Sequence, residues 1–158
     1  MIVKDEQDTI EGCLAPILDL FSQVIVIDTG SSDRTCEILN DRFHIEPLRG
    51  ALDKNNCYSK CGVRNTAFSM IETPWIVSLD ADERISREDL KTLVAMQENP
   101  DVAGYFCRWD TRLNGAVTED YKLPIFRKGL NSRGLVHENV QTDIRARGLN
   151  ALWLEGFC

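Results

Sequence analysis

A run of four β-branched residues, Val24–Ile27, constrains the fold more than any other feature of the sequence. Such an uninterrupted apolar run is typical of a strand that is buried on both faces of a parallel sheet. The run ends at Asp28, and Gly30 and Ser31–Asp33 then indicate a turn and the N-cap of a helix over residues 35–42. Strand, turn and helix in this order are the repeating unit of an α/β fold.

Helical and strand-like segments alternate on both sides of this unit. Helices are predicted where apolar residues recur at helical spacing, and strands where short apolar runs end at turn residues. The predicted helices cover residues 5–20, 35–42, 57–71 and 87–97, and the predicted strands cover 1–3, 24–27, 43–46 and 75–79. Residues 47–56 are predicted as a loop and 99–101 as a turn. Beyond residue 102 the pattern changes to strand-like segments over 103–109, 121–127 and 135–141.

The 158 residues are expected to form one domain, because no linker, repeat or low-complexity tract divides them. We predict a mostly parallel sheet flanked by helices over residues 1–101, and a mixed-β second half over residues 102–158 that completes the site. In open α/β sheets, ligands bind at the carboxyl ends of the strands. Asp28 and the pair Asp80 and Asp82 follow predicted strands, so this edge is the expected binding edge.

Composition excludes several partners. The formal net charge of −7 argues against nucleic acid or an anionic membrane surface as the main partner, since both attract clustered Lys and Arg. No apolar run is long enough to span a bilayer, and Lys4–Glu6 follows the first apolar residues at once, which a secretory signal would not tolerate. A cytoplasmic protein is therefore predicted. Its six scattered cysteines are expected to be reduced, and Cys57 and Cys61 lack the further ligands of a zinc site.

The segment Leu79–Glu83 carries two aspartates spaced two apart, directly after a strand-like run. Side chains spaced two apart in an extended chain point the same way, so Asp80 and Asp82 should lie together. Two neighbouring carboxylates repel each other unless a cation, a basic side chain or water compensates their charge. Mg²⁺ or Mn²⁺ prefers such hard oxygen ligands and leaves room for substrate phosphates. The alternative is the acidic N-terminus of a helix that begins near Ser86.

Two other interpretations of these residues conflict with their context. Asp28–Ser31 matches the active-site sequence of aspartic proteases, but those enzymes need two such aspartates in an all-β fold, whereas a helix is predicted here. A calcium-binding loop that starts at Asp80 would need glycine at its sixth position and glutamate at its twelfth, where Ile85 and Lys91 stand. The protease remains only a remote alternative.

Four motifs resemble, in order and spacing, the family 2 glycosyltransferases of GT-A fold. They are Met1–Glu6, Val26–Thr35, Arg64–Ala67 and Trp75–Glu83. Phe126–Lys128 and Gly134–Glu138 resemble a downstream signature of the bacterial branch that glycosylates lipopolysaccharide core or related surface glycans. The resemblance implies an inverting transferase that moves a sugar from a nucleotide-diphosphate donor, commonly a UDP-sugar, to a glycan or lipid-linked acceptor. It also implies Mg²⁺ or Mn²⁺ held by the Asp-x-Asp motif.

The resemblance also implies donor-binding roles. Asp28 would accept a hydrogen bond from the nucleotide base, and Glu6 would face the nucleoside. Lys60 and Arg64, one helical turn apart, would present positive charge to the base or diphosphate. Each of these residues also has a simpler structural explanation, as a cap, a solvated acid or a surface pair. The expected donor-binding residues are Glu6, Asp28, Ser31, Lys60, Arg64, Asp80 and Arg127.

Metal binding and proton transfer complete the implied site. Asp82 is the expected metal ligand, and Asp80 is expected to bond the ribose or a metal-bound water. Direct displacement with inversion needs a carboxylate to take the proton of the acceptor hydroxyl. Glu138 is the preferred base, and the adjacent His137 could contact metal or diphosphate or serve only as a hydrogen-bonding residue. The other carboxylates considered are Asp120 and Asp110.

The remaining expectations concern the ends of the chain and its partners. Both ends are expected to be incomplete, because related chains carry apolar residues before the first strand and continue past Cys158. A sugar-nucleotide-binding module that contributes to an assembly without catalysis is therefore the alternative function. Asn65 is expected to order a loop, while Trp109 and Trp153 either stack on sugar or pack in the core. The acceptor could bring the protein to the inner face of a membrane, and a homo-oligomer is possible.

Overall fold

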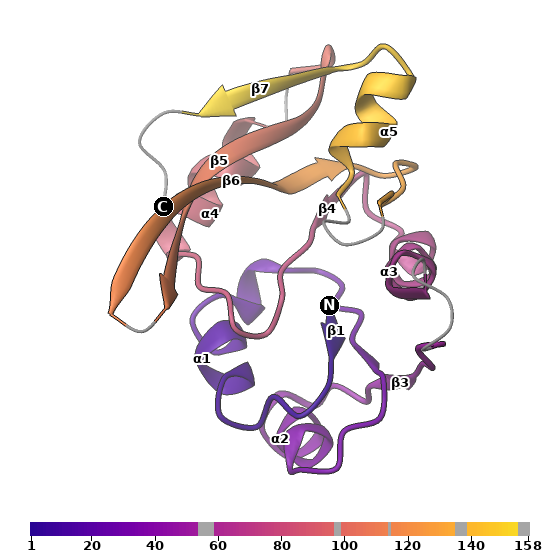
Figure 1. Ribbon diagram of the computed structural model, residues 1–158, viewed down its shortest axis with the longest axis vertical. Coiled ribbons are helices and arrows are strands. Elements are labelled where there is room, and N and C mark those ends of the chain that lie inside the picture. Colours follow the sequence, from indigo (N-terminus) through magenta and orange to yellow (C-terminus); the bar gives the residue numbers. More distant parts are fainter. Residues whose placement is uncertain (54–58, 97–98, 114, 135–138, 155–158) are drawn as a thin grey trace.

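The computed structural model describes residues 1–53, 59–96, 99–113, 115–134 and 139–154. Its two sheets lie in opposite halves of the molecule, with the amino terminus between them (Figure 1). The first sheet is parallel, in the order β1-β2-β3, and consists of Ile2–Val3, Ile27–Asp28 and Leu48–Arg49. The second is mixed, in the order β4-β6-β5-β7, and consists of Trp75–Val77, Ala116–Arg127, Val102–Leu113 and Asn150–Leu154.

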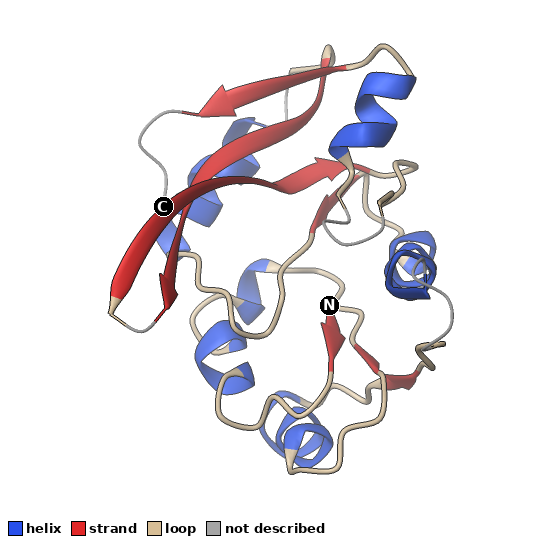
Figure 2. Ribbon diagram, in the orientation of Figure 1, coloured by secondary structure: helices blue, strands red, loops and turns tan. Residues whose placement is uncertain are grey.

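Helices accompany both sheets. Those within the described residues are α1 (Ile10–Leu14), the 3-10 helix η1 (Leu18–Leu20), α2 (Thr35–Phe43), α3 (Ser59–Met70), α4 (Arg87–Ala95) and α5 (Gln141–Ala146). Figure 2 shows α1 and α2 in the half of the parallel sheet, and α4 and α5 in the half of the mixed sheet. None of the described helices is long and apolar enough to cross a membrane.

The β-branched run forms the centre of the parallel sheet, as predicted. The Ile27 amide donates to Met1 O, just before β1, at 3.0 Å, and the Leu48 amide of β3 donates to Val26 O at 2.9 Å. Val26 and Ile27 are buried and Val24 and Ile25 are partly buried, so the second half of the run is covered on both faces. The assigned strand is shorter than predicted, because ladder pairing on both sides is confined to Ile27 and Asp28.

Three predictions in the first half are wrong for identifiable reasons. The helix predicted over residues 5–20 is divided into α1 and η1, because Pro16 has no amide hydrogen and cannot continue the helical hydrogen-bond pattern. The strand predicted over 43–46 is absent, since α2 continues to Phe43 and His44 ends it in the left-handed conformation (φ 55°). The third strand lies instead at Leu48–Arg49, within the predicted loop.

The second half contains more regular structure than predicted. β5 and β6 are each 12 residues long and extend the predicted strands into a hairpin. The predicted strand 135–141 is wrong at its end, because Gln141 begins α5, while residues 135–138 lie outside the described part. β7 was not predicted, and neither was the antiparallel pairing of β4 with β6, which places β4 in the mixed sheet.

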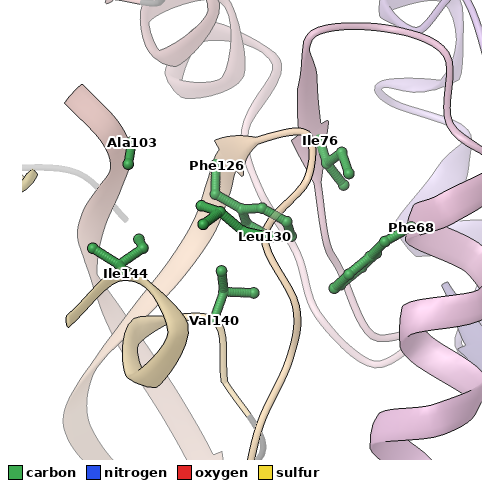
Figure 3. Close-up of a cluster of buried hydrophobic side chains, with 7 residues drawn as sticks. All are labelled: Phe68, Ile76, Ala103, Phe126, Leu130, Val140 and Ile144. Carbon is green, nitrogen blue, oxygen red and sulfur yellow. The ribbon is translucent and has the colours of Figure 1, made fainter. Parts of the chain in front are cut away.

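An aromatic pair links α3 to the mixed sheet. Phe68 of α3 meets Phe126 of β6 edge-to-face, with 5.0 Å between ring centroids, in a buried cluster that also includes Ile76 of β4 and Ile144 of α5 (Figure 3). Phe126 is fully buried. Aromatic pairs in this geometry contribute beyond the area that they bury. The cluster therefore fixes α3, which carries two of the predicted donor-binding residues, against the sheet that carries β4.

Two thiols within the described residues, Cys13 and Cys36, are free, as the prediction of reduced cysteines requires. Cys13, Cys61 and Cys107 are buried. Burial raises the pKa of the Cys13 thiol to about 11, so this thiol stays protonated near neutral pH. Cys57 and Cys158 lie outside the described residues.

A buried carboxylate holds the segment that leads from β6 towards α5. Asp143 is fully buried and accepts a hydrogen bond from the Asn131 amide at 3.0 Å. It also pairs with Arg133 at 2.7 Å and with Arg147 at 2.8 Å. Burial alone would raise the pKa of Asp143, but the Asn131 and Arg133 hydrogen bonds and the charge of Arg147 outweigh it and hold the pKa below its ordinary value.

Replacing Asp143 by alanine is expected to lower the free energy of unfolding by about 3 kcal/mol at neutral pH, because a buried, hydrogen-bonded ion pair loses one partner. A carboxylate whose pKa is lowered on folding stabilises the protein above its ordinary pKa near 4, and this contribution is lost as the pH falls through the lowered value. Urea unfolding should therefore show a difference in the free energy of unfolding between the native chain and Asp143→Ala, and this difference should become smaller in acid. A difference that stays constant with pH contradicts this prediction, and Asp41→Ala on the exposed face of α2 serves as the control.

Candidate active site

A cleft of about 630 Å³ is lined both by residues of β1 and the segment after it and by residues of the mixed sheet. One side is formed by β1 and the segment after it, and by α3; the other is formed by the turn after β4 and by residues 120–124 of β6. The cleft therefore includes Asp80 and Asp82 of the expected binding edge, but not Asp28. Its lining includes five residues predicted from the sequence as donor or metal ligands: Glu6, Lys60, Arg64, Asp80 and Asp82.

The Asp-x-Asp turn presents its carboxylates to this cleft. Asp80 forms an ion pair with Arg64 at 3.0 Å, and the same guanidinium donates to Ser78 Oγ at 3.2 Å. Asp82 is exposed and forms no ion pair within the described part of the chain. Arg64 is largely buried, so it compensates the charge of Asp80 from the protein side and leaves the exposed Asp82 facing the open cleft.

The helix-terminus interpretation of these acids is wrong. Helix α4 begins at Arg87, and its N-cap Ser86 accepts a hydrogen bond from the Asp89 amide at 3.0 Å. Its first-turn acids are Glu88 and Asp89. The field of a helix dipole falls off within the first turn, and Asp80 and Asp82 lie before that turn. Their position at the cleft therefore needs another explanation.

Asp28 and Ser31 are not among the residues that line the cleft. The buried Asp28 carboxylate accepts hydrogen bonds from the Ser31 hydroxyl at 2.5 Å, the Ser31 amide at 3.0 Å and the Gly30 amide at 3.2 Å. Ser31 Oγ in turn accepts from the Asp5 amide at 3.0 Å. These contacts order the turn after β2 and join it to the segment after β1.

Of the other donor-binding candidates, two line the cleft and one does not. Glu6 lines the cleft, where its carboxylate accepts from Thr9 Oγ1 at 2.6 Å, and Lys60 lines it one helical turn before Arg64. Arg127 is not brought to the cleft. Its guanidinium donates to Val102 O at 2.8 Å and to Asn99 O at 2.9 Å, and lies 4.7 Å above the ring of Trp75.

The candidate bases also differ in placement. His137 and Glu138 lie outside the described residues. Asp120 lines the cleft and is exposed, whereas Asp110 is not among the lining residues and pairs with Arg108 at 3.1 Å. Of these two carboxylates, Asp120 is therefore the one that lies at the cleft.

Asn65 orders a loop, as expected. Its side-chain amide accepts a hydrogen bond from the Ser132 amide at 2.7 Å and donates one to the Ser132 carbonyl at 3.1 Å. The side chain thus bonds the backbone of Ser132 in the way that a neighbouring strand would. Trp153 is 57 % exposed and stacks on Phe106 with 4.4 Å between ring centroids, so it does not pack in the core.

Sequence reasoning missed Lys122 and gave Glu83 no role. The buried Glu83 carboxylate forms an ion pair with Lys122 of β6 and accepts the Asp80 amide at 3.0 Å. Lys122 lines the cleft and lies 5.4 Å from the ring centroid of Trp109. A single lysine in a polar strand gives no signal, and this contact depends on the pairing of β6 within the mixed sheet.

The donor set fits a hard divalent cation only in part. Within the described residues, no group of three or more His, Cys, Asp and Glu side chains could hold a metal ion. Asp80 and Asp82 offer carboxylate oxygens at the open cleft. Mg²⁺ is commonly held by one or two carboxylates, with substrate phosphates and waters completing its coordination. The two aspartates supply that number of carboxylates, but Asp80 also pairs with Arg64, so the fit is partial.

The sequence profile of glycosyl transferase family 2 matches residues 1–149, so the chain belongs to this family. It is 33 % identical over 105 residues to a TPR repeat-containing protein of Synechococcus elongatus, covering 66 % of this chain and 25 % of that protein. It is 26 % identical over 160 residues to the lipopolysaccharide core biosynthesis glycosyltransferase LpsC of Rhizobium meliloti, covering 89 % of this chain and 55 % of LpsC.

A crystal structure of TarS residues 1–349 from S. aureus has the same fold. It superposes with a TM-score of 0.54 at 20 % identity, covering 73 % of this chain and 35 % of the TarS chain. The predicted GT-A-type α/β fold is thereby confirmed. The chain spans only a quarter to about half of the length of the relatives named above.

Proposed function

We propose that the chain binds a nucleotide-diphosphate sugar in the cleft and transfers the sugar to a glycan or lipid-linked acceptor. The observation that carries this proposal is the meeting of Asp80 and Asp82 with Lys60 and Arg64 in one cavity of about 630 Å³. Basic side chains and a cation-binding carboxylate pair are what a diphosphate requires. Membership of glycosyl transferase family 2 supports glycosyl transfer in general.

The choice of donor is supported by a structural neighbour. TarS has been crystallised with UDP and with UDP-GlcNAc, and both complexes superpose on this chain with TM-scores of 0.54 and 0.53. UDP is therefore the first nucleotide to test. The relative LpsC is named for lipopolysaccharide core biosynthesis, which favours a cell-envelope glycan as acceptor. Action at the inner face of the membrane is part of the same proposal and rests on that choice of acceptor.

Asp82 would hold Mg²⁺ or Mn²⁺ with help from Asp80, and the bound cation would supply charge stabilisation for the leaving diphosphate. Lys60 and Arg64 would neutralise the remaining phosphate charge, and Glu6 would face the nucleoside. The acceptor hydroxyl oxygen would attack the anomeric carbon as the bond from that carbon to the diphosphate oxygen breaks, which inverts the configuration. Glu138 would take the hydroxyl proton, with Asp120 as the alternative base.

Titration calorimetry of UDP, with and without Mn²⁺, tests the donor site on the native chain. We expect binding that strengthens on adding Mn²⁺ and is lost again when EDTA removes the metal, because the diphosphate and the carboxylates need a shared cation. Absence of binding in every condition contradicts the UDP assignment. Metal-dependent binding without sugar transfer or slow UDP-sugar hydrolysis favours the non-catalytic binding module instead.

A further inference from the structure

The turn that carries the two aspartates is closed by a buried acid. Glu83 is only 8 % exposed. Its amide donates to the Asp80 carbonyl at 3.1 Å, and its Oε2 accepts the Asp80 amide at 3.0 Å. Both bonds join the first and last residues of the turn, so the spacing between Asp80 and Asp82 depends on the place of the Glu83 side chain.

That side chain is held in place from the other half of the protein. Oε1 of Glu83 pairs with Lys122 Nζ, and Lys122 lies on β6 next to Cys107 of β5. The ammonium also lies near the face of Trp109, 5.4 Å from the ring centroid. A buried carboxylate is stable in its charged form only when it is paired and hydrogen-bonded, and Lys122 supplies the cation.

We propose that Lys122 is a positioning residue for the donor site, acting through Glu83 on the turn that carries Asp80 and Asp82; this inference rests on the proposed function. Without Lys122, the Glu83 carboxylate would be buried without a cation. It would turn towards water and release the Asp80 amide. The two cleft carboxylates would then lose the geometry in which they bind a cation together. Residues that orient metal ligands in this way commonly change affinity by 10-fold to 100-fold.

Four variants separate positioning from direct contact with the nucleotide. Lys122→Met is expected to weaken Mn²⁺-dependent UDP binding on the order of tenfold or more. Lys122→Arg is expected to restore it, because the guanidinium can still pair with Glu83. Lys122→Met combined with Glu83→Gln should also restore it, since the neutral amide oxygen accepts from the Asp80 amide and needs no cation. Lys128→Met, which removes an exposed charge just after β6, is the matched control.

The double variant decides the outcome. If Lys122 instead contacted the phosphates, the double variant would bind UDP as weakly as Lys122→Met, and the inference would be overturned. Should Lys122→Met fail to fold, Lys122→Gln keeps most of the side chain and removes the charge. Binding by Lys122→Met and Lys122→Gln at native strength would also overturn the inference.

Hydrogen exchange of the Asp80 amide gives a test without any nucleotide. It should be faster in Lys122→Met than in the native chain, in Lys128→Met and in the double variant, because only Lys122→Met releases the bond to Glu83. Unchanged exchange in Lys122→Met contradicts the inference even if the native chain binds UDP. Failure of the native chain to bind UDP contradicts the proposed function, while the exchange measurement still tests the coupling of Lys122 to the turn.

Discussion

Replacing Asp82 by alanine is expected to abolish Mn²⁺-dependent UDP binding while leaving the fold intact. Asp82 is exposed, lines the cleft and forms no ion pair within the described residues, so its removal breaks no packing or pairing seen in the structure. A cation that depends on one or two carboxylates loses half of its protein ligands or more. We expect a loss of at least about 100-fold in affinity for UDP with Mn²⁺, because removing a direct ligand should cost at least as much as removing a residue that only orients ligands.

Calorimetry on Asp82→Ala and on Asp41→Ala measures this effect against a matched exposed aspartate. Asp41 lies on α2, away from the cleft lining, and its replacement should leave binding at the native level. Urea unfolding should give the same midpoint for native chain and Asp82→Ala. Undiminished, metal-dependent UDP binding by Asp82→Ala would exclude Asp82 as the metal ligand and leave Asp80 as the residue to test.

The second large effect is expected on catalysis. Glu138→Gln should lower the rate of sugar transfer, or of slow UDP-sugar hydrolysis, by roughly 10²-fold to 10⁴-fold, the range that general acid–base catalysis supplies. The amide keeps the size of the side chain but cannot take the acceptor proton. UDP binding should stay near the native level, because the base is expected to meet the acceptor and not the nucleotide.

Asp120→Asn is the matched comparison for this prediction. Asp120 of β6 lines the cleft and is the alternative base proposed above, so it competes with Glu138 for that role. A large rate loss in Asp120→Asn together with a small one in Glu138→Gln would assign the base to β6. The rates are measured as UDP released from UDP-sugars, with and without candidate acceptors.

In the first half of the fold, the sequence predicted those strands and helices well whose own residues carry a clear pattern, such as an apolar run or a helix cap. Val24–Ile27 is apolar throughout and sits between two paired strands, and Ser86 caps α4 near the predicted start. The errors arise where a short segment is decided by its surroundings. Leu48–Arg49 is exposed and has no strand pattern. It still pairs with β2, because the chain that leaves α2 runs along the edge of β2.

The lining of the cleft was predictable where it consists of motif residues. Asp80, Asp82, Lys60, Arg64 and Glu6 come together at one cleft because they follow strands or share a helix face. Arg127 does not line the cleft, because two backbone carbonyls and the ring of Trp75 hold its guanidinium elsewhere. Lys122 could not be predicted, since its role depends on a long-range contact with Glu83, 39 positions earlier in the sequence.

The pairing of β4 with β6 has a consequence for exchanging parts between relatives. β4 leads directly into the turn that carries Asp80 and Asp82, and its neighbour in the sheet comes from the second half of the chain. A chimera joined near residue 101, made to change the acceptor, would replace that neighbour and Lys122 at the same time. Such hybrids should lose donor affinity unless the graft keeps β6 from the parent of the first half.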